Sequence, residues 1–208
     1  MSQQSISLAI TGASGAQYGL RLLECLMHEG VHVDLMLSQP ALVVIGMETE
    51  QKLSGRPAEI ERQLTRQYQA NPGQLSVLGE KQWTAAIASG SGVNDAMVVC
   101  PCTTGTLAAI ATGQSRSLME RAADVCLKER KSLLLVVRET PFSEIHLENM
   151  LRLSRMGVTI MPANPGFYHQ PQSVEDIVDF MVARILEHLD IQQSLMPKWG
   201  GATLRHVR

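Results

Sequence analysis

One apolar run, SLLLVV from Ser132 to Val137, constrains the fold more than any other feature of the chain. Its continuous apolar character predicts a strand buried on both faces, which is typical of a parallel sheet covered by helices. Four further strand-like runs alternate with helix-like segments: Ile6–Ile10, Val31–Leu37, Ala96–Cys100 and Val158–Met161. This alternation predicts an α/β fold, a single-domain doubly wound and mostly parallel sheet with helices on both faces, Rossmann-like or flavodoxin-like.

Turn and capping residues place the helices between these strands. Helices are expected from about Ala16 to Glu29, from Pro40, from Leu107 and over about Leu118–Glu129. Ser143 and Ser173 are predicted N-caps of the last two helices, because a hydroxyl can accept a free backbone N–H. Between about residues 55 and 92 only one helix, near Pro57–Gln69, is predicted.

The composition indicates one domain over residues 1–208, whose tail after about residue 190 is a candidate for packing on a neighbouring subunit. The chain is 45% hydrophobic, and its net charge of −2 argues against bulk nucleic-acid binding. Its longest apolar run is too short to span a bilayer, and MSQQSISLAI lacks the features of a signal peptide. These features predict a cytoplasmic protein.

Four cysteines have a spacing that does not suit a zinc site: Cys25, Cys100, Cys102 and Cys126. We expect buried, reduced thiols and no metal.

Three hydroxyl- or glycine-rich turns follow predicted strands. They are Thr11–Gly15, Ser38 and Thr103–Thr106. In a parallel sheet they would meet at one edge, where small residues and free N–H groups of a helix start can bind a phosphate. They are typical of a mononucleotide site, although a tight turn and ordinary helix caps explain the same residues.

Cations and one carboxylate form a second group of candidates. Arg138 and Glu139 end the SLLLVV strand, where arginine suits a phosphate and a carboxylate can act as an acid. Arg184 falls on the apolar stripe of the last predicted helix, where a cation needs an anionic partner. Lys128 and Tyr168 are weaker candidates. A surface salt bridge, a snorkelling side chain, a helix-dipole contact and a core tyrosine are the alternatives.

The apolar segment Ala41–Met47, followed by Glu48, predicts a surface shared with another subunit.

Together these segments resemble the UbiX/Pad flavin prenyltransferases. The resemblance covers most of the chain and rests on TGASGAQYG, the strand end at Ser38, SGS at 89–91, RAADVCLKER, VVRETPF, MPANPGFYHQPQS and the helix of Arg184. Each piece is unspecific alone, but RAADVCLKER followed by VVRETP is a specific pair.

The resemblance implies a role for each candidate residue. FMN would be bound by Gly12, Ala13, Ser14, Ser38, Thr103, Thr104, Gly105, Thr106 and Arg138. The phosphate of dimethylallyl phosphate would be surrounded by Lys128, Arg138, Tyr168 and Arg184, with Trp199 near the prenyl pocket. Glu139 resembles the acid–base carboxylate, while Ser14 and Glu48 resemble groups that position flavin and substrate. Many family members carry lysine where Gly105 stands, so backbone N–H groups and threonine hydroxyls would serve there.

The same resemblance implies a metal-independent transferase. It would join a dimethylallyl group to N5 and C6 of reduced FMN, release phosphate, and supply prenylated FMN to a UbiD-type decarboxylase, as in ubiquinone biosynthesis. Family members are commonly homododecamers. The alternatives are an FMN-dependent decarboxylase of the cysteine-decarboxylase type, a non-catalytic FMN carrier, and direct decarboxylation of a prenylated hydroxybenzoate. The loop Pro162–Gly166 lacks the methionine–asparagine pattern of the cysteine decarboxylases.

Overall fold

The computed structural model describes residues 3–197, which divide into two compact units between Ala163 and Asn164. The strands of the first unit are β1 Ser5–Ile10, β2 His32–Leu37, β3 Leu75–Leu78, β4 Ala96–Cys102, β5 Ser132–Val137 and β6 Thr159–Ile160. Its helices are α1 Ala16–His28, α2 Gln39–Glu48, α3 Pro57–Gln67, α4 Thr104–Ala111, α5 Leu118–Lys128 and α6 Glu144–Arg155. The second unit contains α7, Val174–His188. Organisation as one domain stays a prediction.

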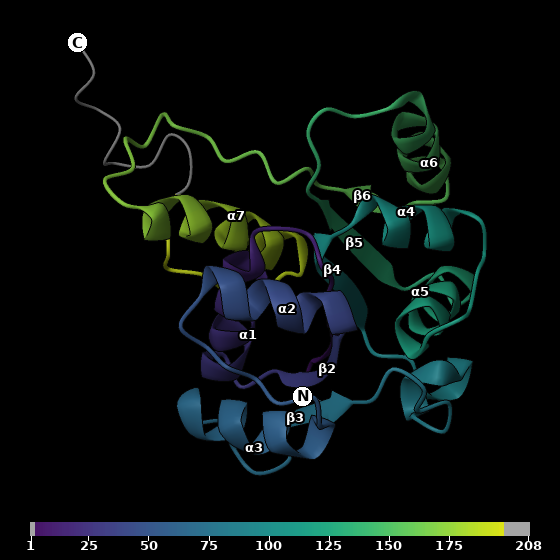
Figure 1. Ribbon diagram of the computed structural model, residues 1–208, viewed down its shortest axis with the longest axis horizontal. Helices are drawn as coiled ribbons and strands as arrows, with labels where there is room; N and C mark the ends of the chain where they lie inside the picture. The colour runs from purple at the N-terminus through teal and green to yellow at the C-terminus, as the bar shows by residue number, and fades with distance from the viewer. Residues whose placement is uncertain (1–2, 198–208) are drawn as a thin grey trace. The chain divides into compact units, whose positions relative to one another are not determined.

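All six strands run parallel, in the order β3-β2-β1-β4-β5-β6 (Figure 1). The predicted α/β doubly wound sheet is therefore confirmed. The chain runs outward from β1 to β3 and then returns to β4, which lies on the other side of β1. Ligands of such sheets bind beyond the carboxyl ends of the strands at this reversal. The ends of β1 and β4 are therefore the place to look for a site.

Alternating strand residues pack against different helices. Ala9, Val99 and Leu135 share one buried cluster with residues of α4, α5 and α6. On the opposite face α1 approaches the sheet closely at Gly19, where an added Cβ would lie 2.3 Å from the Cys100 carbonyl oxygen. Figure 1 shows α1 and α5 on opposite sides of the sheet. Helices thus cover both faces, as predicted.

Hydroxyl side chains begin several helices. Ser38, Thr103 and Ser117 accept a backbone N–H at the starts of α2, α4 and α5. The predicted caps Ser143 and Ser173 are confirmed, and both belong to capping boxes. The predicted start of a helix at Leu107 is wrong, because the cap at Thr103 starts α4 one turn earlier.

The sequence prediction missed β3, which pairs with β2 from Val33↔Leu75 to Met36↔Leu78. Only four residues long, it is interrupted by the polar Ser76, so it lacks the continuous apolar pattern of the central strands. The predicted helix near Pro57–Gln69 is confirmed as α3. Among residues 3–197 no helix has the length and apolar character needed to cross a membrane.

Candidate functional site

The carboxyl ends of β1, β2, β4 and β5 are tied together into one rim. The Ser38 N–H donates to the Ile10 carbonyl at 3.1 Å, which joins the end of β2 to the end of β1. The Arg138 N–H donates to the Cys102 carbonyl at 3.2 Å, which joins the end of β5 to the end of β4. The predicted meeting of Ser38, the two turns and Arg138 at one sheet edge is confirmed.

Thr11 connects the two central turns of this rim. Its N–H and its hydroxyl donate to the Pro101 carbonyl at 3.2 and 2.7 Å, and its Oγ1 accepts the Thr103 N–H at 2.9 Å. The Thr103 hydroxyl is 3.0 Å from that of Thr106. Sequence reasoning placed Thr11 in the turn but gave it no role. Its side chain is buried, and it fixes the spacing of the two turns.

Glu48 binds the start of α1. Its Oε2 accepts the N–H groups of Gly15 at 2.8 Å and Ala16 at 3.1 Å. The prediction that the helix start after the Thr11–Gly15 turn offers free N–H donors is therefore wrong in part. The Glu48 carboxylate already accepts hydrogen bonds from two of these N–H groups. A helix start binds an anion through its N–H groups and dipole, and here that anion is Glu48.

Five influences set the pKa of Glu48. Partial burial by itself raises the pKa, but hydrogen bonds from the Ser14 side chain and from the Gly15 and Ala16 N–H groups lower it. The positive charge of Arg138 lowers it further, and the pKa of Glu48 falls below its ordinary value. Ser14, Glu48 and Arg138 are thus brought together at the rim. A role for Ser14 and Glu48 in positioning a ligand stays a prediction.

Tyr18 is a residue of this rim that sequence reasoning missed. Burial raises the pKa of its hydroxyl, as does Cys100, while the charge of Arg138 lowers it. Arg138 therefore carries its charge close to both Tyr18 and Glu48, from an exposed position. The motif TGASGAQYG contains Tyr18, but its position in the first turn of α1 gives no sequence signal of a role.

Glu139 is partly buried, and its Oε1 accepts the N–H of Thr140 at 3.1 Å. Glu139 directly follows Arg138 in the chain, after the carboxyl end of β5. An acid–base role for Glu139 stays a prediction.

Lys128 lies far from Arg138 within one chain. It ends α5 just before β5, whereas Arg138 follows β5, and six residues of strand span about 20 Å. Its Nζ pairs with the Glu129 carboxylate and lies 2.8 Å from where a Cβ on Gly90 would be, inside the SGS segment. The expected gathering of both cations around one phosphate does not occur within a single chain, and a second copy would have to supply Lys128.

Arg184 and Tyr168 belong to the second unit. The predicted position of Arg184 on the buried stripe of α7 is wrong, because half of its side chain is exposed and it pairs with Glu187. Met181 and Ile185 are buried, but Ile177, seven residues before Arg184, is only partly so. Tyr168 is exposed, and its ring meets Phe180 edge to face at 5.8 Å. Trp199 lies outside the described residues.

The neighbouring His169 stacks on Phe180 with ring centroids 5.3 Å apart, and both of its ring nitrogens are buried without a hydrogen-bond partner. This burial indicates a packing role.

All four cysteines are free and buried, as predicted. Burial raises the pKa of Cys100 far above its ordinary value, that of Cys102 to about 12 and that of Cys126 to about 11. A thiol with such a pKa stays protonated at neutral pH and is a poor nucleophile. Within residues 3–197 no cluster of His, Cys, Asp and Glu is arranged to hold a metal ion.

Residues 1–186 match the flavoprotein family model. The chain is 57% identical over 197 residues to the flavin prenyltransferase UbiX of Pseudomonas aeruginosa, covering 95% of this chain and 94% of that protein. The chain belongs to the UbiX flavin prenyltransferase family.

Solved structures agree with this family. AnUbiX (PadA1), crystallised with FMN and dimethylallyl pyrophosphate, superimposes with a TM-score of 0.85 at 39% identity, over 96% of this chain and 98% of that one. A dodecameric FMN-dependent UbiX-like decarboxylase from Escherichia coli O157:H7 gives 0.84 at 39% identity, over 95% and 100%. The UbiX-type fold of this chain thus extends over nearly its whole length.

Proposed function

We propose that this UbiX-family enzyme joins a dimethylallyl group from dimethylallyl phosphate to N5 and C6 of reduced FMN and releases phosphate. The proposal is supported most strongly by 57% identity over nearly the whole chain to a protein named as a flavin prenyltransferase. The relative crystallised with FMN and dimethylallyl pyrophosphate supports both ligands.

The rim fits a phosphorylated flavin. Its donors are the neutral hydroxyls of Ser38, Thr103 and Thr106, helix-start N–H groups and the Arg138 guanidinium, which together suit an anion and a polar ring edge. Gly12 lets the first turn pass directly over Pro40, since an added Cβ would lie 2.4 Å from the Pro40 Cβ. Ala13 and Ser14 complete that turn, and Thr104 and Gly105 begin α4.

Reduced FMN supplies the nucleophilic ring atoms, and the residues of this chain orient the reactants and stabilise charge. Arg138 places a fixed positive charge beside the Glu48 carboxylate, next to the first turn. Glu139 would supply a proton from an Oε atom as the C–O bond to phosphate breaks, or take up the proton that the flavin ring loses. Lys128, Tyr168 and Arg184 would bind the departing phosphate, with Trp199 near the prenyl group.

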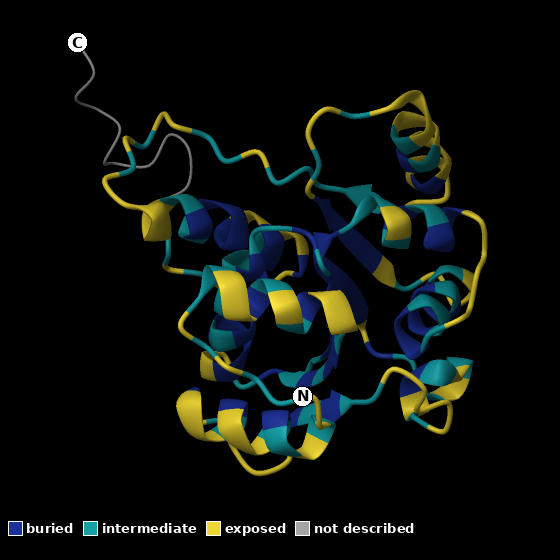
Figure 2. Cartoon of the chain, in the orientation of Figure 1, coloured by how far each residue is buried: buried dark blue, intermediate teal, exposed yellow. Residues whose placement is uncertain are grey.

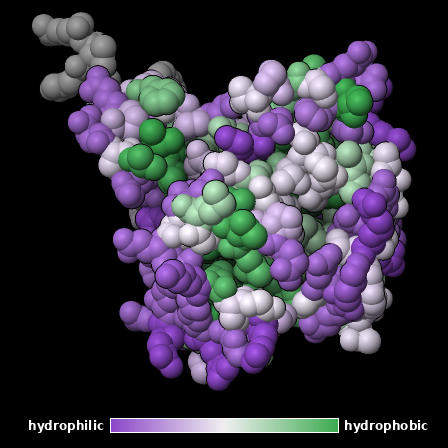
Figure 3. Space-filling model, viewed as in Figure 1, coloured by the Kyte–Doolittle hydropathy of each residue, from purple (hydrophilic) through white to green (hydrophobic). Residues whose placement is uncertain are grey.

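Oligomerisation is part of this proposal. Val43 and Met47 of α2 are 61% and 79% exposed, and Figure 2 shows the outward side of α2 as exposed. Figure 3 shows apolar side chains gathered over the same helix. The UbiX-like structure is described as dodecameric. We expect a homododecamer here too, in which this surface is covered and another copy brings Lys128 toward the rim.

The product would be prenylated FMN for a UbiD-type decarboxylase, as in ubiquinone biosynthesis. A cytoplasmic location also stays a prediction.

Phosphate release tests the reaction. Under anaerobic conditions, reduced FMN with dimethylallyl phosphate should release about one phosphate per flavin, while oxidised FMN should release none. Phosphate release without any flavin would indicate a phosphatase. Carbon dioxide from a peptide ending in cysteine would favour the decarboxylase alternative, and binding of FMN without either product would favour a carrier.

A further inference from the structure

Three aromatic rings of the second unit pack against one another. Phe180 of α7 is buried, and the His169 ring stacks on it with 5.3 Å between centroids and 9° between planes. The Tyr168 ring meets both of them edge to face, with its centroid 5.8 Å from each. Offset stacking and edge-to-face contact are the arrangements that aromatic pairs prefer. These three residues form a ring cluster in which Tyr168 contacts two neighbours.

Gly166 leaves the space that this ring cluster occupies. A Cβ added there would lie 2.7 Å from the Tyr168 Cε1 and 3.1 Å from the Phe180 Cζ. The backbone of Gly166 is not in the left-handed region, so its conformation does not require glycine. Any larger residue at this position would push the Tyr168 ring away from Phe180.

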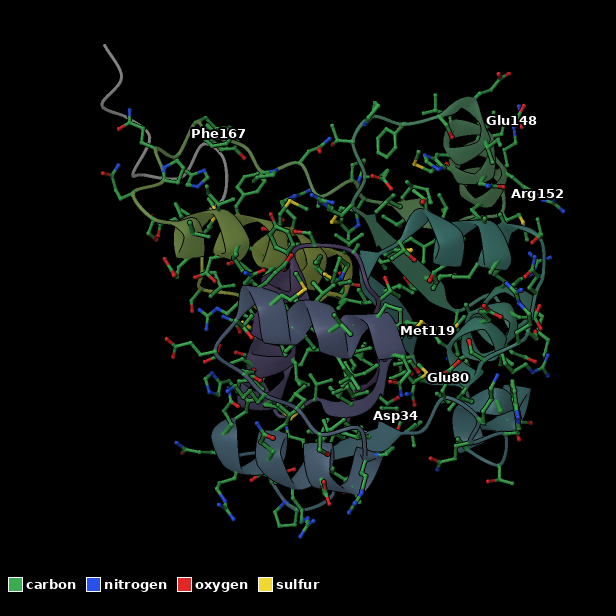
Figure 4. The ribbon with its side chains drawn as sticks, in the orientation of Figure 1. Asp34, Glu80, Met119, Glu148, Arg152 and Phe167 are labelled. Carbon is green, nitrogen blue, oxygen red and sulfur yellow. The ribbon has the colours of Figure 1, made fainter. Side chains whose placement is uncertain are left out.

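Hydrogen bonds tie the loop that carries Tyr168 to the start of α7. The Gln170 N–H donates to the Phe167 carbonyl at 2.9 Å, and the Gln172 side-chain amide donates to the Gln170 carbonyl at 2.7 Å. The Gln172 N–H donates to Asp176, in the first turn of α7, also at 2.7 Å. Figure 4 labels Phe167 in this loop, which runs beside α7. The loop backbone and the Tyr168 ring are therefore held by the same helix.

Arg184 follows Phe180 by one turn of α7. Residues four apart in a helix lie on the same side, with Cβ atoms about 5–6 Å apart. A Tyr168 ring that packs on Phe180 is therefore held on the side of α7 that carries Arg184. A phenol hydroxyl and a guanidinium are both hydrogen-bond donors that suit the oxygens of one phosphate.

The ring of His169, and not its nitrogens, contributes to the cluster. Both ring nitrogens are buried, and neither has a hydrogen-bond partner among residues 3–197. A buried polar group without a partner opposes folding, so the nitrogens give the packing no support. A flat apolar ring at this position should serve equally well.

We propose that Phe180 is a positioning residue which, with His169 and Gly166, holds Tyr168 so that its hydroxyl and Arg184 bind the same substrate phosphate. The inference rests on the proposed use of dimethylallyl phosphate. Tyr168 lies in a loop and is 51% exposed, so its ring would otherwise have to be ordered when the substrate binds. Ordering it beforehand removes that cost, which improves the affinity for dimethylallyl phosphate and not for FMN.

Titration of dimethylallyl phosphate into protein loaded with oxidised FMN measures this affinity without turnover. Phe180→Leu keeps an apolar side chain but removes the ring, and it should raise the Kd for dimethylallyl phosphate about 3–10-fold. Gly166→Ala should raise it by a similar factor, because the added methyl group displaces the Tyr168 ring. The Kd for FMN should stay within about twofold of wild type in both variants.

Two comparisons show whether Phe180 acts through Tyr168. Tyr168→Phe should raise the Kd for dimethylallyl phosphate about 10–100-fold, the usual effect of losing a hydrogen bond to a charged group. Adding Phe180→Leu to Tyr168→Phe should change it by less than about twofold further. With reduced FMN, Phe180→Leu should raise the KM for dimethylallyl phosphate and keep kcat within about twofold.

His169 and Val182 supply the matched controls. His169→Ala should raise the Kd for dimethylallyl phosphate as Phe180→Leu does, whereas His169→Phe keeps a flat ring and should restore it to within about twofold of wild type. Val182 is buried in α7 two residues after Phe180, nearly on the opposite side of the helix. Val182→Ala should lower the melting temperature but leave both Kd values unchanged.

An unchanged Kd for dimethylallyl phosphate in Phe180→Leu and Gly166→Ala would overturn the positioning role, and so would an equal rise in Val182→Ala. A loss in His169→Phe as large as in His169→Ala would assign the effect to the imidazole nitrogens and overturn the role of the ring cluster. Wild-type protein that binds FMN but not dimethylallyl phosphate would refute the proposed substrate itself. Binding of both ligands by wild type, with no change in the variants, would refute this inference alone.

Discussion

The carboxylate of Glu48, at the end of α2, accepts the N–H of Gly15 at 2.8 Å and so closes the start of α1. This bond joins residues 33 positions apart and fixes the turn in which Ser14 lies. The chain therefore uses its own anion at the start of α1.

Removing this carboxylate should destabilise the protein. Glu48→Ala takes away the acceptor of two helix-start N–H groups, a loss that usually costs about 0.5–2 kcal/mol. For a chain of this size, the melting temperature at fixed subunit concentration should fall by roughly 2–8 °C. Glu50→Ala removes an exposed carboxylate two residues away and should change it little. Equal melting temperatures for the two variants would contradict the role of Glu48.

The contribution of Glu48 should depend on pH. Its folded-state pKa lies below the ordinary value, because its hydrogen bonds and Arg138 outweigh the opposing effect of burial. The stabilisation is therefore complete above the unfolded pKa of about 4.3 and is lost as the pH falls through the lower folded pKa. The melting-temperature difference between wild type and Glu48→Gln should be constant from about pH 7 to 5 and shrink below about pH 4. A melting-temperature difference that grows as the pH falls would contradict a lowered folded-state pKa of Glu48.

Two glycines of the rim should respond in opposite ways to alanine. Gly12→Ala places a Cβ 2.4 Å from the rigid Pro40 ring, and such overpacking usually costs about 1–3 kcal/mol. Gly105→Ala meets open space in the first turn of α4 and should be neutral or stabilising by up to about 1 kcal/mol. Thermal melting and FMN titration of both variants check this pair. If both variants are as stable as wild type, the first turn can move away from Pro40, which would contradict the predicted cost.

Glu139→Gln should separate binding from chemistry. The amide can still accept the Thr140 N–H but cannot exchange a proton at neutral pH, so FMN affinity should be kept. Prenyl transfer should slow by about 10²–10⁴-fold, the usual contribution of a positioned acid or base. The rate of phosphate release under single-turnover conditions gives the value, and an unaltered rate would exclude proton transfer by Glu139.

Arg184 and Glu187 form a matched pair for the substrate phosphate. Arg184→Gln should raise the KM for dimethylallyl phosphate more than it raises the Kd of FMN. Glu187→Gln removes the ion-pair partner but keeps the cation, so activity should remain. If both variants lose activity, the ion pair matters for the stability of α7 and not for the substrate. If neither variant loses activity, Arg184 does not bind the substrate phosphate.

The sequence predicted the rim well because parallel strands bring their carboxyl ends to one edge. Ser38, Thr103 and Arg138 each directly follow a strand, so locating the strands also located them. Non-local contacts could not be predicted in this way. Nothing in the spacing of Glu48 and Gly15 indicates that they meet, and the same holds for Tyr168 and Phe180.

The positions of two cations could not be predicted, for physical reasons. Within one chain the direction of α5 places Lys128 at the end of the strands opposite Arg138, which the apolar pattern of the helix does not reveal. Arg184 is seven residues after Ile177, which is only about 20° short of two full turns, so the two residues lie on nearly the same side of α7. Because Ile177 itself lies at the border of that stripe, Arg184 reaches solvent.

The mass of the flavin after reaction tests the central claim most directly. The protein is incubated anaerobically with reduced FMN and dimethylallyl phosphate, and the released flavin is measured by mass spectrometry, with Glu139→Gln as the matched slow variant. The account predicts that the flavin gains one five-carbon prenyl unit with wild type and gains it much more slowly with the variant. A flavin of unchanged mass after incubation with folded, FMN-bound wild type would contradict it.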